Sequence, residues 1–477
     1  MILKENIPYN YAYLLTFLVS IVSALLCFHP DIHYNSDLKI SSVGLVIADT
    51  IAENPFSFHH LLPGFKANGG FTKYLNWPPL FYWLLALWFK LGVNSILSAR
   101  ICMVLIKIGT DILFLKYLET LKIEAKQSLL LAIIFCLIPF RLTYLDLIFG
   151  DSMVFLFIIA TLYFDTLKQY TWLVITAMVG TLSSWYFLVF VGGYFCLHLF
   201  QKKRSKTSWL LLMAVVMTIA CWLLYIYLLS KNQEVLPSTK AIGRKQAAPI
   251  TFFKHGLSYT WLYSLNGLTA LKVSIKWLIK LAIETSAISL ALLCVNKVTR
   301  EKLFQSLLPF MIGFTLLVLC LPYLFIVHNH NIYFISFGLA LYLSTKIKPN
   351  LPWYTLLLLP MVYGGILYKE HVYHETKLRN NFILEQMQKS HSTNLFINNP
   401  AHQLIHEQFM CTPWYLMYKS KAMVFERLGD QENKAAFIAA QLAKTKDKNY
   451  VIVSTVAIEE LAPLEKYSNG LYSYSSK

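Results

Sequence analysis

Three aspartates stand at the ends of long apolar runs, where a charged side chain is costly unless it has a partner or a function. Asp37 lies in YNSDLKISS, a few residues after the first run, and Asp146 and Asp151 lie in YLDLIFGDS between two later runs. A carboxylate can take a proton from a hydroxyl, orient a second substrate or bind a metal ion. We therefore predict that Asp37, Asp151 and Asp146 share one catalytic site.

Structural alternatives stay open for these carboxylates. Asp151 precedes Ser152 and an apolar run, which is also the position of a helix N-cap. Asp37 is also compatible with a solvated loop residue. Asp111 and Asp165 fall inside or near helix ends, and we assign them structural roles.

Cationic and imidazole side chains near the same boundaries could hold an anionic group. His328 and His330 stand in IVHNHNIYF at the end of a late apolar run, and Lys73 and Arg100 stand between the first two runs or at the start of the second. An imidazole can donate to a phosphate or share a metal ion with a carboxylate. The alternatives are interfacial anchoring for the histidines and simple contact with lipid headgroups for the cations.

The composition defines the elements that must position these residues. The 477 residues are 56% hydrophobic and only 14% charged, whereas a typical soluble domain has about 25% charged residues. Lipid must therefore be part of the solvent of this chain. We predict an all-α polytopic membrane protein with about eleven transmembrane helices. The runs are 10–28, 98–118, 127–144, 152–167, 171–184, 186–200, 208–229, 274–295, 303–326, 331–345 and 351–368.

Basic clusters predict the orientation of these helices. Clusters within 116–126, 202–206, 297–302 and 346–348 all fall on the cytoplasmic side if the N-terminus is cytoplasmic. The segments 29–97, 230–273 and 369–477 then lie outside. The outer segment 230–273 is itself basic, an exception that the charge rule tolerates in long loops.

Two outer segments have structure of their own. The run at 79–91 is about 20 Å long as a helix and rich in aromatic residues, so we predict a helix at the outer membrane surface. Short β-prone runs at 394–398 and 450–455 and a helical stretch at 430–445 predict a small α/β domain. The predicted domains are a transmembrane domain over 1–368, with the first external loop at 29–97, and an extracytoplasmic domain over 369–477.

Charge and cysteine usage exclude other classes. The net charge is +17, but the lysines and arginines form short clusters between apolar runs, which indicates topology rather than nucleic-acid binding. The eight cysteines include no CxxC pair, so neither a zinc site nor a disulfide framework is predicted. The first apolar run lacks a signal-peptide cleavage site, and we interpret it as a retained first span.

Three motifs carry a resemblance to a known family. They are Asp37 in the first external loop, the stretch NWPPLFYWLLALWFKLG followed by Ser98-Ala99-Arg100, and the acidic residues in YLDLIFGDSMVFLF. This layout resembles the GT-C superfamily of membrane glycosyltransferases over roughly residues 1–200. It is most similar to the branch of bacterial protein-mannosyltransferase-like and aminoarabinose-transferase-like enzymes. HNHNIYF also resembles a late external helix start in that family.

The resemblance implies a donor sugar on a polyprenyl phosphate and an acceptor hydroxyl on a glycolipid, a saccharide or a protein. Asp37 would take the acceptor proton in an inverting single displacement, with Asp151 or Asp146 orienting the acceptor. The site would lie at the outer face of the membrane, which in a bacterium is the periplasmic face of the inner membrane.

The donor phosphate would lie against cationic side chains, with Arg100 first and His328, His330 and Lys73 next. No metal cofactor is assigned; if a divalent metal binds, Asp37 with Asp151 or His330 would hold it. The chain departs from the family in two places. Leu38 follows Asp37 where many members have glutamate. Asn76-Trp77 stands where aminoarabinose-branch relatives have Glu-Lys, which argues against an aminoarabinose donor.

Two other function classes remain. A transporter or flippase of lipid-linked saccharides needs no catalytic carboxylate, and its charged groups would lie at mid-membrane depth. A scaffold for envelope assembly would bind partners through the external domain. Neutralising Asp37 separates the three, because only the enzyme loses turnover.

Overall fold

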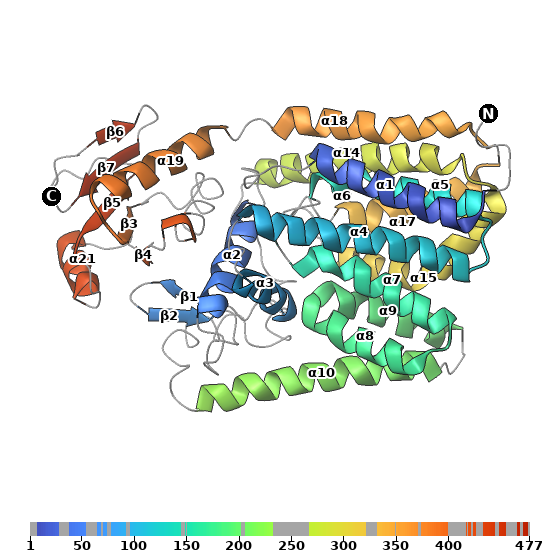
Figure 1. The fold of residues 1–477 in the computed structure, drawn as a ribbon, viewed down its shortest axis with the longest axis horizontal. Coiled ribbons are helices and arrows are strands. Elements are labelled where there is room, and N and C mark those ends of the chain that lie inside the picture. The colour runs from blue at the N-terminus through green and yellow to red at the C-terminus, as the bar shows by residue number, and fades with distance from the viewer. Residues whose placement is uncertain are drawn as a thin grey trace.

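The computed structural model shows a long helical bundle with a small β-sheet at one end (Figure 1). The described residues are 7–27, 38–53, 64–67, 70–73, 78–91, 96–144, 148, 150–201, 206–231, 267–320, 332–348, 350–370, 374–398, 416, 418–420, 423–425, 433–443, 448–454, 465–467 and 471–475.

Each predicted apolar run coincides with helix in the structure. The bundle helices are α1 (Tyr9–Cys27), α4 (Ile96–Thr120), α5 (Ala125–Cys136), α6 (Pro139–Thr143), α7 (Val154–Thr166), α8 (Tyr170–Ser183), α9 (Trp185–Phe200), α10 (Lys206–Lys231), α14 (Gly267–Leu292), α15 (Lys297–Cys320), α17 (Ile332–Lys346) and α18 (Leu358–Glu370). Two 3-10 helices, η2 (Gly150–Met153) and η4 (Trp353–Leu357), precede α7 and α18. The runs at 171–184 and 186–200 form α8 and α9, and Ser184 alone separates these two helices.

The run predicted as one helix over 127–144 is broken in the structure. It forms α5 and the five-residue α6, with Pro139 at the first turn of α6. Proline has no backbone N–H to continue the preceding helix, but its fixed φ suits a helix start. Because of this break, α6 is a separate helix and not a continuation of α5.

Long apolar helices expose hydrophobic side chains around the bundle. Within the described residues, Tyr9–Cys27 and Lys206–Tyr225 are long and apolar enough to cross a membrane. Other apolar helices, such as α7, α8 and α9, are shorter than 18 residues. Leu26, Phe200 and Met361 are 77%, 81% and 71% exposed. The number of membrane crossings stays a prediction.

Aromatic rings fill the centre of the bundle. Phe334 of α17 stacks on Phe155 of α7 and on Phe314 of α15, with ring centroids 5.0 Å apart in both pairs. Phe310 lies 4.5 Å from Phe314 by the same measure. These contacts join α7, α15 and α17 around one apolar core.

Two further helices cover the end of the bundle nearest the sheet. They are α2 (Leu38–Glu53) and α3 (Leu80–Lys90), and they pack against each other. The helix predicted over 79–91 is confirmed as α3, which also contacts α4, α8 and η2. Phe81, Tyr82 and Leu85 of α3 are buried in a core that also contains Leu395 and Val451 of the sheet.

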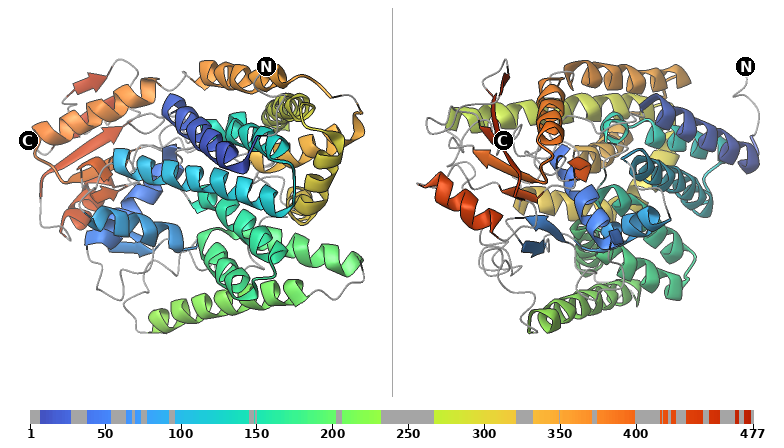
Figure 2. Two further views of the ribbon diagram at one scale, coloured as in Figure 1. Left: turned by 45° about the vertical axis from the view of Figure 1, so that its right-hand side comes forward. Right: turned by 60° about the vertical axis from the view of Figure 1, so that its left-hand side comes forward.

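Within the described residues the sheet has seven strands, with β4–β3–β5 parallel to one another. Its order is β2 (Gly70–Lys73), β1 (Gly64–Ala67), β4 (Met423–Phe425), β3 (Asn394–Asn398), β5 (Tyr450–Ser454), β7 (Leu471–Ser475) and β6 (Glu465–Tyr467). Figures 1 and 2 show it with α19 (His374–Lys389) and α21 (Lys434–Leu442) beyond the end of the bundle. The strands predicted at 394–398 and 450–455 and the helix within 430–445 are confirmed.

The sheet crosses the predicted domain boundary at residue 368. The sequence placed every strand after that boundary, but β1 and β2 come from the first loop and form an antiparallel hairpin. Ala67 of β1 pairs in parallel with Val424 of β4. Local periodicity does not encode a pairing between segments so far apart in the chain. The division into two domains stays a prediction.

Candidate active site

Four of the predicted site residues lie outside the described part of the chain. They are Asp37, Asp146, His328 and His330. Asp37 directly precedes Leu38, the first residue of α2, and His330 precedes α17 by two residues. The structure therefore describes the helices that follow these residues but not the residues themselves.

The other three predicted residues lie on described elements. Asp151 lies in η2 and Lys73 ends β2, and for both residues the structure describes the backbone alone. Arg100 lies in the second turn of α4 and is 2% exposed, although it carries a full charge. A buried arginine in a folded protein requires polar or anionic surroundings. Among the predicted phosphate-binding residues, Arg100 is the one whose side chain the structure describes, and its role stays a prediction.

The helix that follows Asp37 packs against the segment between Asp146 and Asp151. A Cβ on Gly44 of α2 would lie 2.4 Å from the backbone oxygen of Ile148. No side chain fits in that space, so the backbones of α2 and of Ile148 are in direct contact. This contact brings together two segments that are about a hundred residues apart in the sequence.

The element that carries Asp151 is held by a similar close contact. A Cβ on Gly150 would lie 2.4 Å from the backbone oxygen of Ser183, at the junction of α8 and α9. Phe81 of α3 lies beside both Gly44 and Gly150. Ser184 caps α9 by accepting a hydrogen bond from the Tyr186 backbone N–H. The glycines thus let α2, η2 and the α8–α9 junction meet around the Phe81 ring.

The C-terminal half of α3 is bonded to the start of α4 and to α2. The indole N–H of Trp88 on α3 donates to the Ser98 hydroxyl of α4, two residues before Arg100. Further along α3, Lys90 Nζ donates to the backbone oxygen of Ala52 in α2, at 3.3 Å. Both bonds tie α3 to the helices on either side of it.

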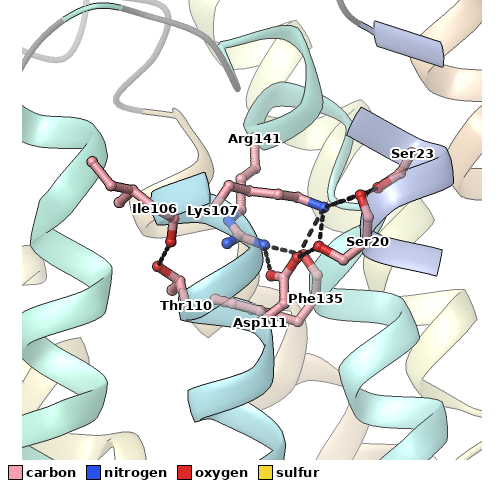
Figure 3. Close-up of polar contacts among 8 residues, drawn as sticks. All are labelled: Ser20, Ser23, Ile106, Lys107, Thr110, Asp111, Phe135 and Arg141. Atoms are coloured by element: carbon pink, nitrogen blue, oxygen red, sulfur yellow. Dashed lines mark hydrogen bonds and ion pairs between the residues drawn. The ribbon is translucent and has the colours of Figure 1, made fainter. Parts of the chain in front are cut away.

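A network of charged residues lies inside the bundle (Figure 3). Asp111 and Lys107 are one turn apart on α4, and Arg141 comes from α6. Asp111 is fully buried, and Lys107 Nζ lies 2.9 Å from its Oδ2. Arg141 Nη1 donates to Asp111 Oδ1 at 2.5 Å. The carboxylate therefore has one cation on each oxygen.

Two serines of α1 complete the network. Ser20 Oγ donates to Asp111 Oδ2 at 2.5 Å, and Lys107 Nζ donates to Ser23 Oγ at 2.9 Å. Figure 3 shows these side chains pointing toward one another from three elements. The network connects α1, α4 and α6 through buried polar atoms.

Phe135 of α5 makes two contacts with the arginine. Arg141 Nη1 donates to the Phe135 backbone oxygen at 3.0 Å, and its guanidinium lies 4.1 Å from the centre of the Phe135 ring. A guanidinium over an aromatic face is favourable, most of all when both groups are desolvated. Arg141 is therefore fixed by α4 and α5 together.

Sequence reasoning assigned Asp111 a structural role but did not identify its partners. Lys107 and Asp111 are four residues apart in an apolar run, a spacing that brings side chains together on one helix face. That spacing could have indicated the pair. No local signal could have indicated Arg141, because its contact with Asp111 depends on the packing of α6 against α4.

Two other carboxylates, the partly buried Asp165 and the buried Glu284, also join helices. Asp165 of α7 accepts a hydrogen bond from Thr207 of α10 at 2.7 Å, and another from the Tyr194 hydroxyl of α9. Glu284 of α14 accepts one from Ser336 of α17 at 2.9 Å. Within the described ranges, no three His, Cys, Asp or Glu residues come together as metal ligands.

The fold is similar to that of solved structures, whereas the sequence comparisons found no match. No protein-family model and no curated protein matches the chain. Among solved structures, the crystal structure of ArnT from Cupriavidus metallidurans in the apo state is similar at 12% sequence identity. The match covers 96% of this chain and 97% of that chain, with a TM-score of 0.47. A likeness at this TM-score carries no conclusion about function.

Proposed function

We propose that this protein is a membrane glycosyltransferase of the GT-C type. It moves a sugar from a polyprenyl phosphate to the hydroxyl of a glycolipid, a saccharide or a protein. The reaction takes place at the outer face of the membrane, on the side that carries the C-terminal domain. In a bacterium this is the periplasmic face of the inner membrane.

One observation supports this proposal above the others. Gly44 of α2 and Ile148 are in backbone contact, and these two segments continue in the sequence to Asp37 and Asp151. Asp37 precedes the first residue of α2, and Asp151 follows Ile148 by three residues. Two carboxylates on segments that meet in this way suit one shared site.

The exposed surface of the bundle supports a membrane location. Large apolar side chains of α1, α10 and α14 are exposed, among them Leu25, Met213 and Leu278 at 69%, 55% and 55%. Soluble monomers rarely expose large contiguous apolar patches. A bilayer is the environment in which such helix faces are stable.

The proposed mechanism is a single displacement with inversion. Asp37 accepts the proton of the acceptor hydroxyl while its oxygen bonds to the anomeric carbon. The bond from that carbon to the phosphate oxygen breaks, and polyprenyl phosphate leaves with the electron pair. Asp151 or Asp146 orients the acceptor.

Positive charge stabilises the departing phosphate. Arg100 is the first candidate because it is buried at the start of α4, and His328, His330 and Lys73 are the others. The proposal needs no metal. If one binds, Asp37 with Asp151 or His330 would hold it.

The test is release of polyprenyl phosphate from a panel of polyprenyl-phosphate sugars. Membranes containing wild-type protein, Asp37→Asn or Asp151→Asn are compared at equal expression. We expect Asp37→Asn to lose turnover by a factor of about 100 or more, because removing a general base costs about 10²–10⁴. Asp151→Asn should also lower turnover, because an acceptor that is not oriented reacts more slowly.

The matched control is Glu301→Gln. Glu301 is 47% exposed and pairs with Lys297 within α15, so this variant should turn over like wild type. Equal turnover in wild type and Asp37→Asn would exclude Asp37 as the base. Absence of turnover with every donor, together with intact folding, would contradict the proposal.

One observation favours a second candidate, a transporter or flippase of lipid-linked saccharides. Lys107, Asp111 and Arg141 place charges inside the bundle, as a transport pathway would. These three side chains form ion pairs with one another, whereas the charged groups of a transport pathway would face a water-filled cavity. A flippase would translocate a labelled lipid-linked sugar across vesicle membranes, and Asp37→Asn would leave that rate unchanged.

A further inference from the structure

The ion network of Lys107, Asp111 and Arg141 places three charged side chains where apolar side chains could pack. It contains two cations and one carboxylate, and all three side chains are at most 8% exposed. Buried ion pairs are weak contributors to stability, and well-packed apolar residues often stabilise a core as well or better. The network therefore calls for a role besides holding the helices together.

The short helix α6 is held by this network and by packing against α18. Its five residues are too few to form a stable helix alone, since isolated helices below about 12 residues are marginal. Arg141 is its central residue and binds Asp111 of α4 and the backbone of Phe135 at the end of α5. These bonds fix α6 to the two preceding helices.

The chain runs from α6 to η2 within a few residues. Thr143 ends α6, and η2 begins at Gly150 with Asp151 next. At the far end of this connection, Ile148 contacts Gly44 of α2 and Gly150 contacts Ser183. The ion network thus holds α6, which precedes this connection, and the two glycine contacts hold Ile148 and Gly150 near its end.

We infer that Arg141, held by Asp111 and Lys107, is a positioning residue for η2 and its aspartate. The network fixes the orientation of α6 and thereby the direction of the chain that leads to η2. Charged hydrogen bonds are directional, so they fix an orientation more precisely than apolar contacts do. This inference rests on the proposed function, since Asp151 matters only if its segment belongs to a site.

The experiment removes the network without leaving an unpaired charge. The triple variant Lys107→Met, Asp111→Leu, Arg141→Met replaces all three groups with apolar side chains. Folding is checked by monodisperse size exclusion and the thermal midpoint in detergent. Amide hydrogen exchange over 144–153 and steady-state sugar transfer are then measured.

We expect the triple variant to fold and to exchange faster at 144–153. We also expect kcat to fall by up to about 100-fold, as for a small misplacement of reacting groups, while KM for the donor stays near the wild-type value. Arg141→Lys keeps the charge and should partly restore kcat relative to Arg141→Met. It also serves as the test variant if the triple variant does not fold.

Asp165→Asn is the matched control. Asp165 also joins three helices but lies at the other end of α7, so exchange at 144–153 should not change in this variant. If the triple variant folds and its exchange rates and kcat equal those of the wild type, the inference is overturned. The network would then only hold the helices together. Faster exchange at 144–153 combined with no sugar transfer by wild type would instead keep the positioning role and reject the proposed function.

Discussion

Tyr418 lies where the first loop and the C-terminal segment pack together. Its side chain is 7% exposed, and its ring centroid lies 6.4 Å from that of Phe89 in α3. Burial raises the pKa of Tyr418, and the negative charge of Asp49 on α2 raises it further. Both effects favour the neutral phenol in the folded protein.

This raised pKa predicts a loss of stability at alkaline pH. An unfolded tyrosine has a pKa of about 10, so the contribution of Tyr418 is complete below that pH and is lost as pH rises toward the folded value. The loss is at most about 1.4 kcal/mol per pH unit for one proton. Thermal unfolding from pH 8 to 11 should show a smaller alkaline decrease in Tyr418→Phe than in wild type. Parallel curves for the two proteins would contradict the prediction.

At the level of the elements, α9 and α15 cross with their backbones in close contact. A Cβ on Gly193 would lie 2.1 Å from the backbone oxygen of Pro309, and one on Gly313 would lie 2.3 Å from that of Val189. Small residues at such crossings let helix backbones approach, which is a main source of helix association in membranes. The two glycines set the distance between α9 and α15.

Neighbouring glycines of α9 provide a matched test of this crossing. Gly193→Ala places a methyl group against the α15 backbone and should destabilise the bundle by about 1–3 kcal/mol, as overpacking does. Gly192→Ala meets nothing within 4 Å, so its effect should stay within about 1 kcal/mol. Thermal midpoints in detergent measure both variants. Equal midpoints would show that α9 and α15 do not cross at Gly193.

For the whole molecule, the sheet is the feature that joins distant parts of the chain. Val424 of β4 pairs with Ala67 of β1 on one side and with Leu395 of β3 on the other. The first loop, which begins near Asp37, is thereby tied to the C-terminal segment. We expect the C-terminal segment to hold the first loop in place, and not to act as a separate appendage.

A proline in β4 tests this dependence. Val424→Pro removes a backbone donor from a central strand, where proline is not tolerated. We expect hydrogen exchange to rise by about tenfold or more in β1 as well as in β3. Lys466→Pro disturbs β6 at the opposite edge, and it should leave β1 protected. Unchanged exchange in β1 of Val424→Pro would show that the β1–β2 hairpin is stable without β4.

The sequence determined many of the elements, because their signals are local. Apolar runs predicted the bundle helices apart from the separate α6, the aromatic run at 79–91 predicted α3, and short β-prone runs predicted β3 and β5. The elements that were not predicted are α2, α19, β1, β2, β4, β6 and β7. Pro139 within the third run also carried the signal for the break between α5 and α6. The sequence also predicted a candidate site near Asp151, since a carboxylate at the end of an apolar run is unusual, and that site stays a prediction.

Tertiary structure alone decided which elements meet. It brought Gly44 of α2 against Ile148, Arg141 against Asp111, and β1 against β4. Each contact joins residues that are tens to hundreds of positions apart, and its energy exists only when both partners are packed together. Helix and strand patterns record the face that each element buries, but they do not record its partner.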